Sequence, residues 1–128
     1  MLNYGIMNMM KDGTIVSQRD IILIPFPYSN LSENKKRPAI VLSNEEYNSK
    51  NGDVICCAIT SNPRNYERSI VINEKDLDEG NLRYESEVKP NKVFTLSQSL
   101  VIKRLAKLNV DKSKEIICQL DFFIKIDE

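Results

Sequence analysis

The sequence predicts a mainly β protein, a small and strongly curved barrel of antiparallel strands with helical additions. Short apolar runs rich in β-branched residues recur along the chain between turn-forming segments. The last part of the chain carries one clear helical spacing of apolar residues. The 128 residues, 41% of them hydrophobic, suffice for one compact core. We therefore expect a single domain over residues 19–128, preceded by a flexible extension over residues 1–18.

The first two strands are expected on either side of a polar loop. Residues 21–24 are all isoleucine or leucine, and the prolines that follow stop the strand because proline cannot donate to a strand ladder. Residues 28–36 are polar and turn-forming, which favours an exposed loop. The second strand is then expected over residues 39–43.

The middle of the chain predicts a short helix and a central strand. Asn44 is a favourable N-cap for a helical turn that runs through Lys50, and Asn51-Gly52 marks a tight turn after it. Residues 54–59 are apolar at every position. That pattern predicts a central strand buried on both faces.

The second half of the chain predicts further strands and a closing helix. A strand over residues 69–72 leads into an acidic turn that ends at Gly80. Further β structure is expected at Val88 and over residues 93–96 and 101–108. Asp111 or Ser113 is expected to cap the last helix. Its apolar residues follow a helical spacing and form one stripe: Ile116, Ile117, Leu120, Phe123 and Ile124.

The charges of the chain cancel overall but are unevenly distributed. There are eighteen basic and eighteen acidic residues. Residues 88–110 hold five cations and no acid, whereas residues 73–87 hold six acids and two bases. This asymmetry indicates either one positive face that steers an anionic ligand or two ordinary solvated surfaces.

Several classes of site are excluded by composition. The chain has no histidine, which removes zinc-hydrolase and serine-histidine chemistry. Cys56 and Cys57 are adjacent and Cys118 is distant, so we expect reduced structural thiols whose pKa burial raises. We expect no metal and no cofactor. No membrane span or signal peptide is recognisable, which predicts a cytoplasmic protein.

Arg37 and Thr60 are the candidate chemical groups. Pro38 restricts the residue before it to an extended conformation, so the Arg37 guanidinium is held as a fork for phosphate, with a surface ion pair as the alternative. Thr60 ends the central strand. In an antiparallel barrel the end of one core strand can lie beside the beginning of another, so the two side chains are expected to meet on one rim.

Taken together, these residues resemble the MazF/PemK-like toxins of type II toxin-antitoxin systems. The matching segments, in order, are Arg19-Asp20-Ile21-Ile22-Leu23, where the family has an opening Gly-Asp strand, Lys36-Arg37-Pro38-Ala39-Ile40-Val41-Leu42, the VICCAITSN run at 54–62, Ser86-Glu87-Val88-Lys89-Pro90 and Lys92-Val93-Phe94-Thr95-Leu96. The resemblance implies an SH3-like barrel, a homodimer and a metal-independent, sequence-specific endoribonuclease that cuts single-stranded mRNA. It also implies a cognate antitoxin protein as partner, and Arg37 and Thr60 as the catalytic pair.

The same reading predicts a groove that binds RNA between two loops. Its candidate RNA-binding residues are Tyr28, Ser29, Asn30, Lys35, Lys36, Ser61, Asn62, Arg64, Lys89 and Asn91. Lysine and arginine would contact phosphates, and Tyr28 and Tyr66 are candidates either for base stacking or for simple barrel packing.

Two departures from the family pattern leave open a change of rate or cleavage sequence, or an alternative function. Arg19 stands where the family has glycine, and Lys89 and Asn91 stand near an arginine and an aspartate that some members use in acid-base work. Asn91 cannot ionise, and Lys89 keeps the charge but not the fork. The alternative is a catalytically weakened barrel that binds nucleic acid or an antitoxin-like peptide without cleavage.

Overall fold

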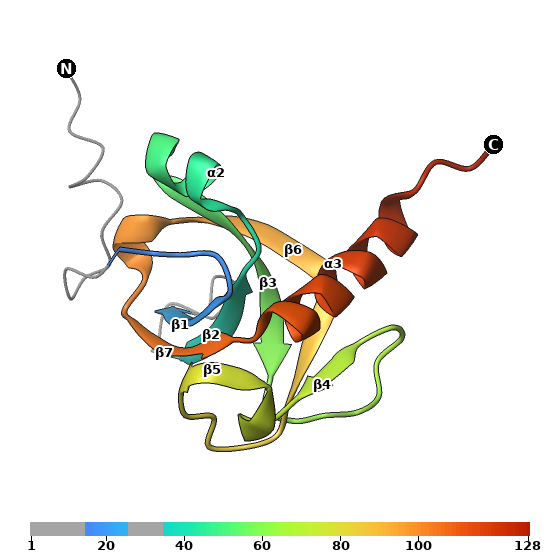
Figure 1. Cartoon of the computed structure of the whole chain (residues 1–128), viewed down its shortest axis with the longest axis horizontal. Coiled ribbons are helices and arrows are strands. Elements are labelled where there is room, and N and C mark those ends of the chain that lie inside the picture. The colour runs from blue at the N-terminus through green and yellow to red at the C-terminus, as the bar shows by residue number, and fades with distance from the viewer. Residues whose placement is uncertain (1–14, 26–34) are drawn as a thin grey trace.

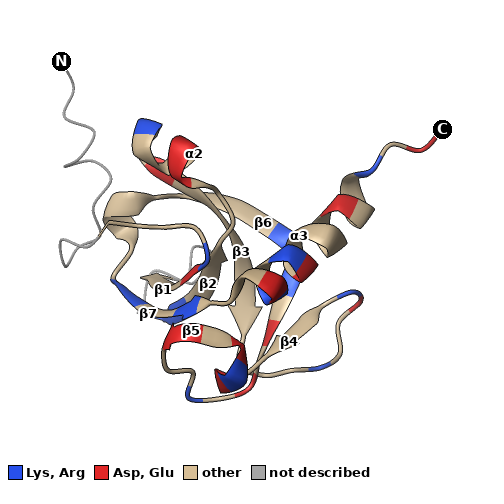
Figure 2. Ribbon diagram, viewed as in Figure 1, with Lys and Arg blue, Asp and Glu red and all other residues tan. Residues whose placement is uncertain are grey.

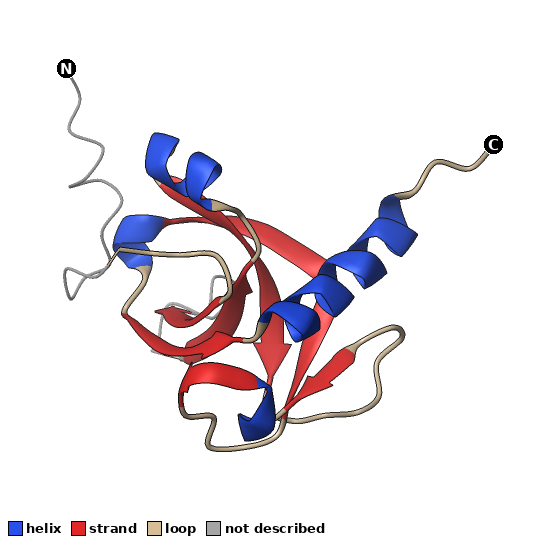
Figure 3. Ribbon diagram, in the orientation of Figure 1, coloured by secondary structure: helices blue, strands red, loops and turns tan. Residues whose placement is uncertain are grey.

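The structure, a computed structural model, describes residues 15–25 and 35–128 (Figure 1). One seven-stranded antiparallel sheet has the order β4-β6-β3-β2-β1-β7-β5 and curls into a half-barrel, with the long helix α3 running across it (Figure 3). The predicted fold class is therefore confirmed. The strands are β1 (Asp20–Pro25), β2 (Lys36–Val41), β3 (Asp53–Thr60), β4 (Ile70–Ile72), β5 (Leu77–Gly80), β6 (Ser86–Ser97) and β7 (Lys103–Leu108). The helices are α2 (Glu45–Lys50), α3 (Val110–Ile124) and the 3-10 turns η1 (Glu74–Asp76) and η2 (Gln98–Leu100).

The core lies on both faces of the central strands. Along β2, Ala39 and Val41 belong to one apolar cluster, while Ile40 between them belongs to the other. On β3, Cys56 and Cys57 divide between the clusters in the same way. Each isoleucine fully removed from water contributes about 1.5–3 kcal/mol, so this alternation fixes which residues point to which face.

Two parts of the sheet, β2 and the segment that holds β5, depart from the sequence prediction. The second strand begins at Lys36 rather than at residue 39, because Arg37 and Pro38 already pair with β1. Proline is tolerated there because it stands near the start of the strand. The expected acidic turn contains η1 and β5 instead. Asp76 is buried, and its carboxylate accepts the backbone N–H of Asn73 at 2.9 Å.

The cap of α3 also differs from the prediction. Asn109 is the N-cap, and its side-chain oxygen accepts the backbone N–H of Lys112 at 2.8 Å, so neither Asp111 nor Ser113 has this role. Of the expected apolar stripe, Ile116 is fully buried in the core but Ile117 and Ile124 are exposed. Among residues 15–25 and 35–128, no helix has the length and apolarity that crossing a membrane requires.

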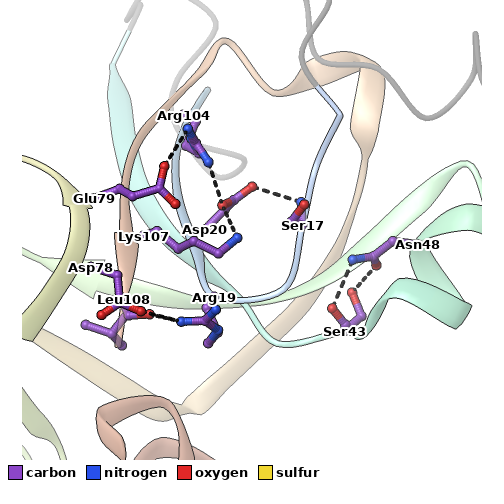
Figure 4. Close-up of polar contacts among 10 residues, drawn as sticks. All are labelled: Ser17, Arg19, Asp20, Ser43, Asn48, Asp78, Glu79, Arg104, Lys107 and Leu108. Atoms are coloured by element: carbon purple, nitrogen blue, oxygen red, sulfur yellow. Dashed lines mark hydrogen bonds and ion pairs between the residues drawn. The ribbon is translucent and has the colours of Figure 1, made fainter. Parts of the chain in front are cut away.

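The turn before β1 uses a left-handed arginine. Arg19 has φ of 76°, and the backbone N–H of Asp20 donates to the Ser17 carbonyl at 3.1 Å, as in a turn that favours glycine at this place. Nη1 of Arg19 donates to the Leu108 carbonyl at 2.8 Å and to Asp78 Oδ2 at 2.9 Å (Figure 4). The side chain therefore links β1 to β7 and β5 while the backbone keeps a glycine-like conformation.

The acidic and basic segments meet at the edge formed by β5 and β7. Asp20 is buried, and its Oδ1 lies 3.3 Å from Lys107 Nζ and 3.6 Å from Arg104 Nη1 (Figure 4). Arg104 also contacts Glu79 at 3.4 Å. Figure 2 shows the cations of β7 beside the acids of β5. The two oppositely charged segments of the sequence thus partly neutralise each other.

Replacing Arg19 separates the effect of its backbone from that of its side chain. Arg19→Gly and Arg19→Ala both lose the guanidinium contacts, but only glycine relieves the left-handed backbone. We expect Arg19→Ala to be less stable than Arg19→Gly by about 1 kcal/mol. Urea unfolding of the two variants measures this difference. Equal stability, or a more stable alanine variant, would contradict the assignment of strain to this turn.

Candidate active site

Strand register brings three polar side chains into one row. The β2–β3 ladder pairs Ala39 with Ala58, and continuation of that register places Arg37 opposite Thr60. The β3–β6 ladder then pairs Thr60 with Glu87. Paired residues of antiparallel strands project from the same face of the sheet. Arg37, Thr60 and Glu87 therefore share one face at one end of three neighbouring strands.

Solvent exposure decreases along this row of three side chains. Arg37 is exposed, Thr60 is half-buried and Glu87 is completely buried. Thr60 Oγ1 accepts the backbone N–H of Asn62 at 3.1 Å. A threonine hydroxyl that accepts one hydrogen bond still has its own O–H to donate. The accessible end of the row thus offers a guanidinium and an oriented hydroxyl.

An exposed loop of residues 61–69 follows Thr60 and joins β3 to β4. Asn65 and Arg68 both have φ of 54°, so two residues other than glycine adopt the left-handed conformation within this short loop. With its side-chain oxygen turned toward the guanidinium, Asn62 accepts from Arg64 Nη2 at 3.1 Å and Nε at 3.3 Å. The left-handed backbone of Asn65 and Arg68 persists only where surrounding contacts enforce it.

Glu87 supplies those contacts from beneath the loop. Its Oε1 accepts the backbone N–H of Arg64 at 2.8 Å, and its Oε2 accepts the backbone N–H of Tyr66 at 2.9 Å and the hydroxyl of Ser69. Burial alone would raise the pKa of the carboxyl. The hydrogen bonds from Ser69, Arg64, Tyr66 and Asn65 outweigh it and hold the pKa of Glu87 below its ordinary value.

Sequence reasoning missed Glu87. The sequence places Glu87 among the six acids of residues 73–87, as part of a charged segment, whereas the structure buries it completely. The available signal was its position immediately before Val88, at the start of a β-rich run. A glutamate inside a buried strand needs hydrogen-bond partners, but the sequence does not show which segment supplies them.

Two cationic side chains also connect the 61–69 loop to neighbouring elements. Lys89 Nζ lies 3.8 Å from the centre of the Tyr66 ring, and 38% of Tyr66 remains exposed. Arg68 donates to Gln119 Oε1 at 2.8 Å, and its guanidinium lies 3.2 Å from the centre of the Phe122 ring. The loop is therefore fastened to β6 on one side and to α3 on the other.

The other predicted site residues are distributed around this row. Lys35 and Lys36 are exposed at the beginning of β2, Ser61 precedes Asn62 on the loop, and Asn91 is exposed on β6. Asn91 lies where the β3–β6 register shifts, and it is not brought into the row. The predicted residues Tyr28, Ser29 and Asn30 fall outside the described residues.

Possible metal ligands and thiols are the other groups of the described residues that could carry chemistry. Within 15–25 and 35–128, no group of histidine, cysteine, aspartate and glutamate side chains is arranged to hold a metal ion. Burial raises the pKa of both Cys56 and Cys57 to about 12, so these thiols stay protonated at neutral pH. These two thiols are structural, as the sequence predicts, but Cys118 is exposed and the prediction is wrong there.

The fold is a small antiparallel half-barrel, and one end of its central strands carries an exposed arginine, a threonine hydroxyl and a polar loop held by Glu87. A family model described as "PemK-like, MazF-like toxin of type II toxin-antitoxin system" matches residues 17–124. The chain belongs to this toxin family. The comparison with curated proteins found no match.

Solved structures of low sequence identity share the fold. A MazE–MazF complex from Deinococcus radiodurans is 19% identical with a TM-score of 0.70, over 88% of this chain and 98% of that chain. An endoribonuclease in complex with its cognate antitoxin from Mycobacterial species is 14% identical with a TM-score of 0.70, over the same shares. The Mycobacterium tuberculosis toxin MazF-mt6 is 16% identical with a TM-score of 0.67, over 86% of this chain and 100% of that chain.

The lowered pKa of Glu87 predicts how stability depends on pH. The ionised carboxylate stabilises the folded chain above the ordinary glutamate pKa of about 4.3, and this contribution is lost as the pH falls through the lower pKa of the folded state. Glu87→Gln should therefore lower the free energy of unfolding at neutral pH. Its deficit relative to wild type should shrink below about pH 4. Urea unfolding of both proteins over this range measures the deficit.

The matched control is Glu67→Gln, which neutralises an exposed glutamate of the same loop. Its free energy of unfolding should stay within about 0.5 kcal/mol of wild type throughout. A Glu87→Gln deficit that is constant, or that grows toward acid, would show that the charge of Glu87 does not stabilise the fold.

Proposed function

We propose that this chain is the ribonuclease toxin of a toxin-antitoxin pair and cuts single-stranded RNA at a preferred sequence without a metal ion. Membership of the toxin family supports the class of activity. The observation that carries the proposal is the β2–β3 register, whose continuation beyond Ala39 and Ala58 puts Arg37 opposite Thr60 at one end of the strands. These two residues are the proposed catalytic pair.

RNA supplies its own nucleophile, which suits a site without histidine. The ribose 2′-oxygen attacks the adjacent phosphorus, the bond from phosphorus to the 5′-oxygen breaks, and the 2′ proton is removed while the leaving oxygen gains one. A 2′,3′-cyclic phosphate and a 5′-hydroxyl result. Arg37 donates hydrogen bonds to the phosphorane oxygens, where negative charge develops, and this is the largest contribution expected of the site. Thr60 holds the phosphate or relays a proton.

The RNA strand is proposed to run from the start of β2 across the row to the loop. Lys35 and Lys36 attract phosphates at one end, and Arg64 does so on the loop. Tyr66 has one ring face against Lys89 and remains partly exposed, so it can stack a base. The proposal therefore uses Lys89 to support Tyr66 as well as to add positive charge.

A protein inhibitor and a second copy of the chain complete the proposal. Two of the similar structures contain an antitoxin with the toxin or endoribonuclease. We propose that a cognate antitoxin covers the same RNA groove in this protein and that the toxin acts as a homodimer in the cytoplasm.

The binding-only alternative remains a distinct outcome. Asn91 is exposed outside the row and cannot ionise, so no carboxylate at that position assists proton transfer. A chain that holds RNA but transfers protons slowly would behave as a binding module.

Cleavage by the purified protein tests the proposal. In EDTA, wild type should cut a mixed-sequence RNA at a short preferred motif, and a 2′-deoxy substitution at the cut site should block the reaction. Arg37→Ala and Thr60→Ala should each reduce the cleavage rate by roughly 10²-fold or more, because each loses a group that acts in the transition state.

Arg83→Ala and Thr95→Ala are the matched controls, since both remove exposed side chains outside the row. They should keep the wild-type rate within about twofold. RNA that stays intact across a diverse pool while binding persists would replace the nuclease with the binding-only alternative.

A further inference from the structure

The RNA-facing loop is built around a buried negative charge. Residues 61–68 are all exposed, yet Glu87 beneath them is completely buried. Within the described part of the chain, its hydrogen bonds come from this one loop, from the backbone of Arg64, Asn65 and Tyr66 and from the Ser69 hydroxyl. A carboxylate that accepts several donors satisfies most of its lone pairs and is thereby kept ionised.

The partners of Glu87 act as dipoles and not as counterions. Within residues 15–25 and 35–128, Glu87 forms no ion pair, and the neighbouring Lys89 lies over the Tyr66 ring. A dipole is favourable only when it points at the charge. Arg64 and Tyr66 must therefore turn their N–H groups inward, which sends their side chains toward solvent from a fixed backbone.

We propose that Glu87 is a positioning residue that presets the 61–69 loop for RNA by ordering it before the substrate arrives. This inference rests on the proposed function and assigns the loop a role in affinity and sequence choice. The left-handed Asn65 sits between the two N–H groups that point at the carboxylate. Without the Glu87 carboxylate, the loop around Asn65 is no longer held in this conformation. The free energy of RNA binding must then include the cost of ordering the loop.

Glutamine at this position cannot replace the carboxylate. A side-chain amide has one acceptor oxygen, and its NH2 group would face an inward N–H of the loop. One donor would remain unpaired in a buried place, which costs more than the lost hydrogen bond alone. Glu87→Gln is therefore expected to free the loop while the strands keep their apolar packing.

The first measurement uses the protein without RNA. In wild type, the amides of Arg64 and Tyr66 should exchange with D2O at least about tenfold more slowly than the exposed neighbour Glu67, because they donate to a buried charge. Glu87→Gln should abolish this protection, whereas Glu67→Gln should preserve it. Unprotected amides in wild type would overturn the proposal without any variant having to fold.

The second measurement is a double-mutant cycle on RNA cleavage. If Glu87 acts through the loop, Arg64→Ala should raise KM about tenfold in wild type but less than about threefold beside Glu87→Gln. Lys36→Ala, on β2, should raise KM by the same factor in both backgrounds. Glu87→Gln alone should raise KM about tenfold and leave kcat within about twofold. Glu87→Asp, which keeps the charge, should recover part of the lost affinity.

These outcomes separate the two proposals. Additive effects of Arg64→Ala and Glu87→Gln, or a loss confined to kcat, would overturn the positioning role while leaving the nuclease intact. Wild type that neither binds nor cuts RNA would overturn the proposed function and with it the RNA role of the loop. The exchange data would then still decide whether Glu87 orders that loop.

Discussion

The antiparallel register across β2, β3 and β6 is the constraint on which the site depends. Side chains alternate between faces along a strand, so a slip of one residue in β2 would turn Arg37 away from Thr60. The core opposes that slip. Ile40 and Val41 would exchange apolar clusters, and each misplaced aliphatic side chain would forfeit part of the roughly 1.5–3 kcal/mol that its burial contributes. The packing that stabilises the barrel therefore also aligns the chemical groups.

The loop next to this row departs from local preferences in a way that the strands do not. Two left-handed residues lie within it, and a buried carboxylate lies beneath it. Each feature alone is unfavourable, but together they compensate, because the N–H groups on either side of the left-handed Asn65 are the ones that satisfy the charge. Conflict with local rules of this kind is concentrated at functional sites. Arg19 shows the same kind of conflict outside the candidate site, since its guanidinium contacts offset the cost of a turn that favours glycine.

The sequence predicts those features that depend on neighbours along the chain. The central strand follows from an unbroken apolar run, and the position of Arg37 follows from the restriction that Pro38 imposes. The N-cap at Asn44 is local too, and it is found where expected. The role of Glu87 could not be predicted because its partners lie some twenty residues away and, apart from the Ser69 hydroxyl, are backbone groups, which every residue possesses. The cap at Asn109 was missed for a different reason, because two other good caps follow it within four residues.

The neighbouring positions of Glu87 and Thr60 raise the question of whether the carboxylate is the general base that a chain without histidine needs. The geometry argues against it. Both carboxylate oxygens already accept hydrogen bonds from the loop, and those bonds hold the pKa of Glu87 below its ordinary value, which makes it a weaker base. A proton delivered to this carboxylate would also release the loop that holds the substrate. In the proposed nuclease the charge of Glu87 must therefore persist throughout the reaction, and stabilisation of the phosphorane by Arg37 carries most of the rate enhancement.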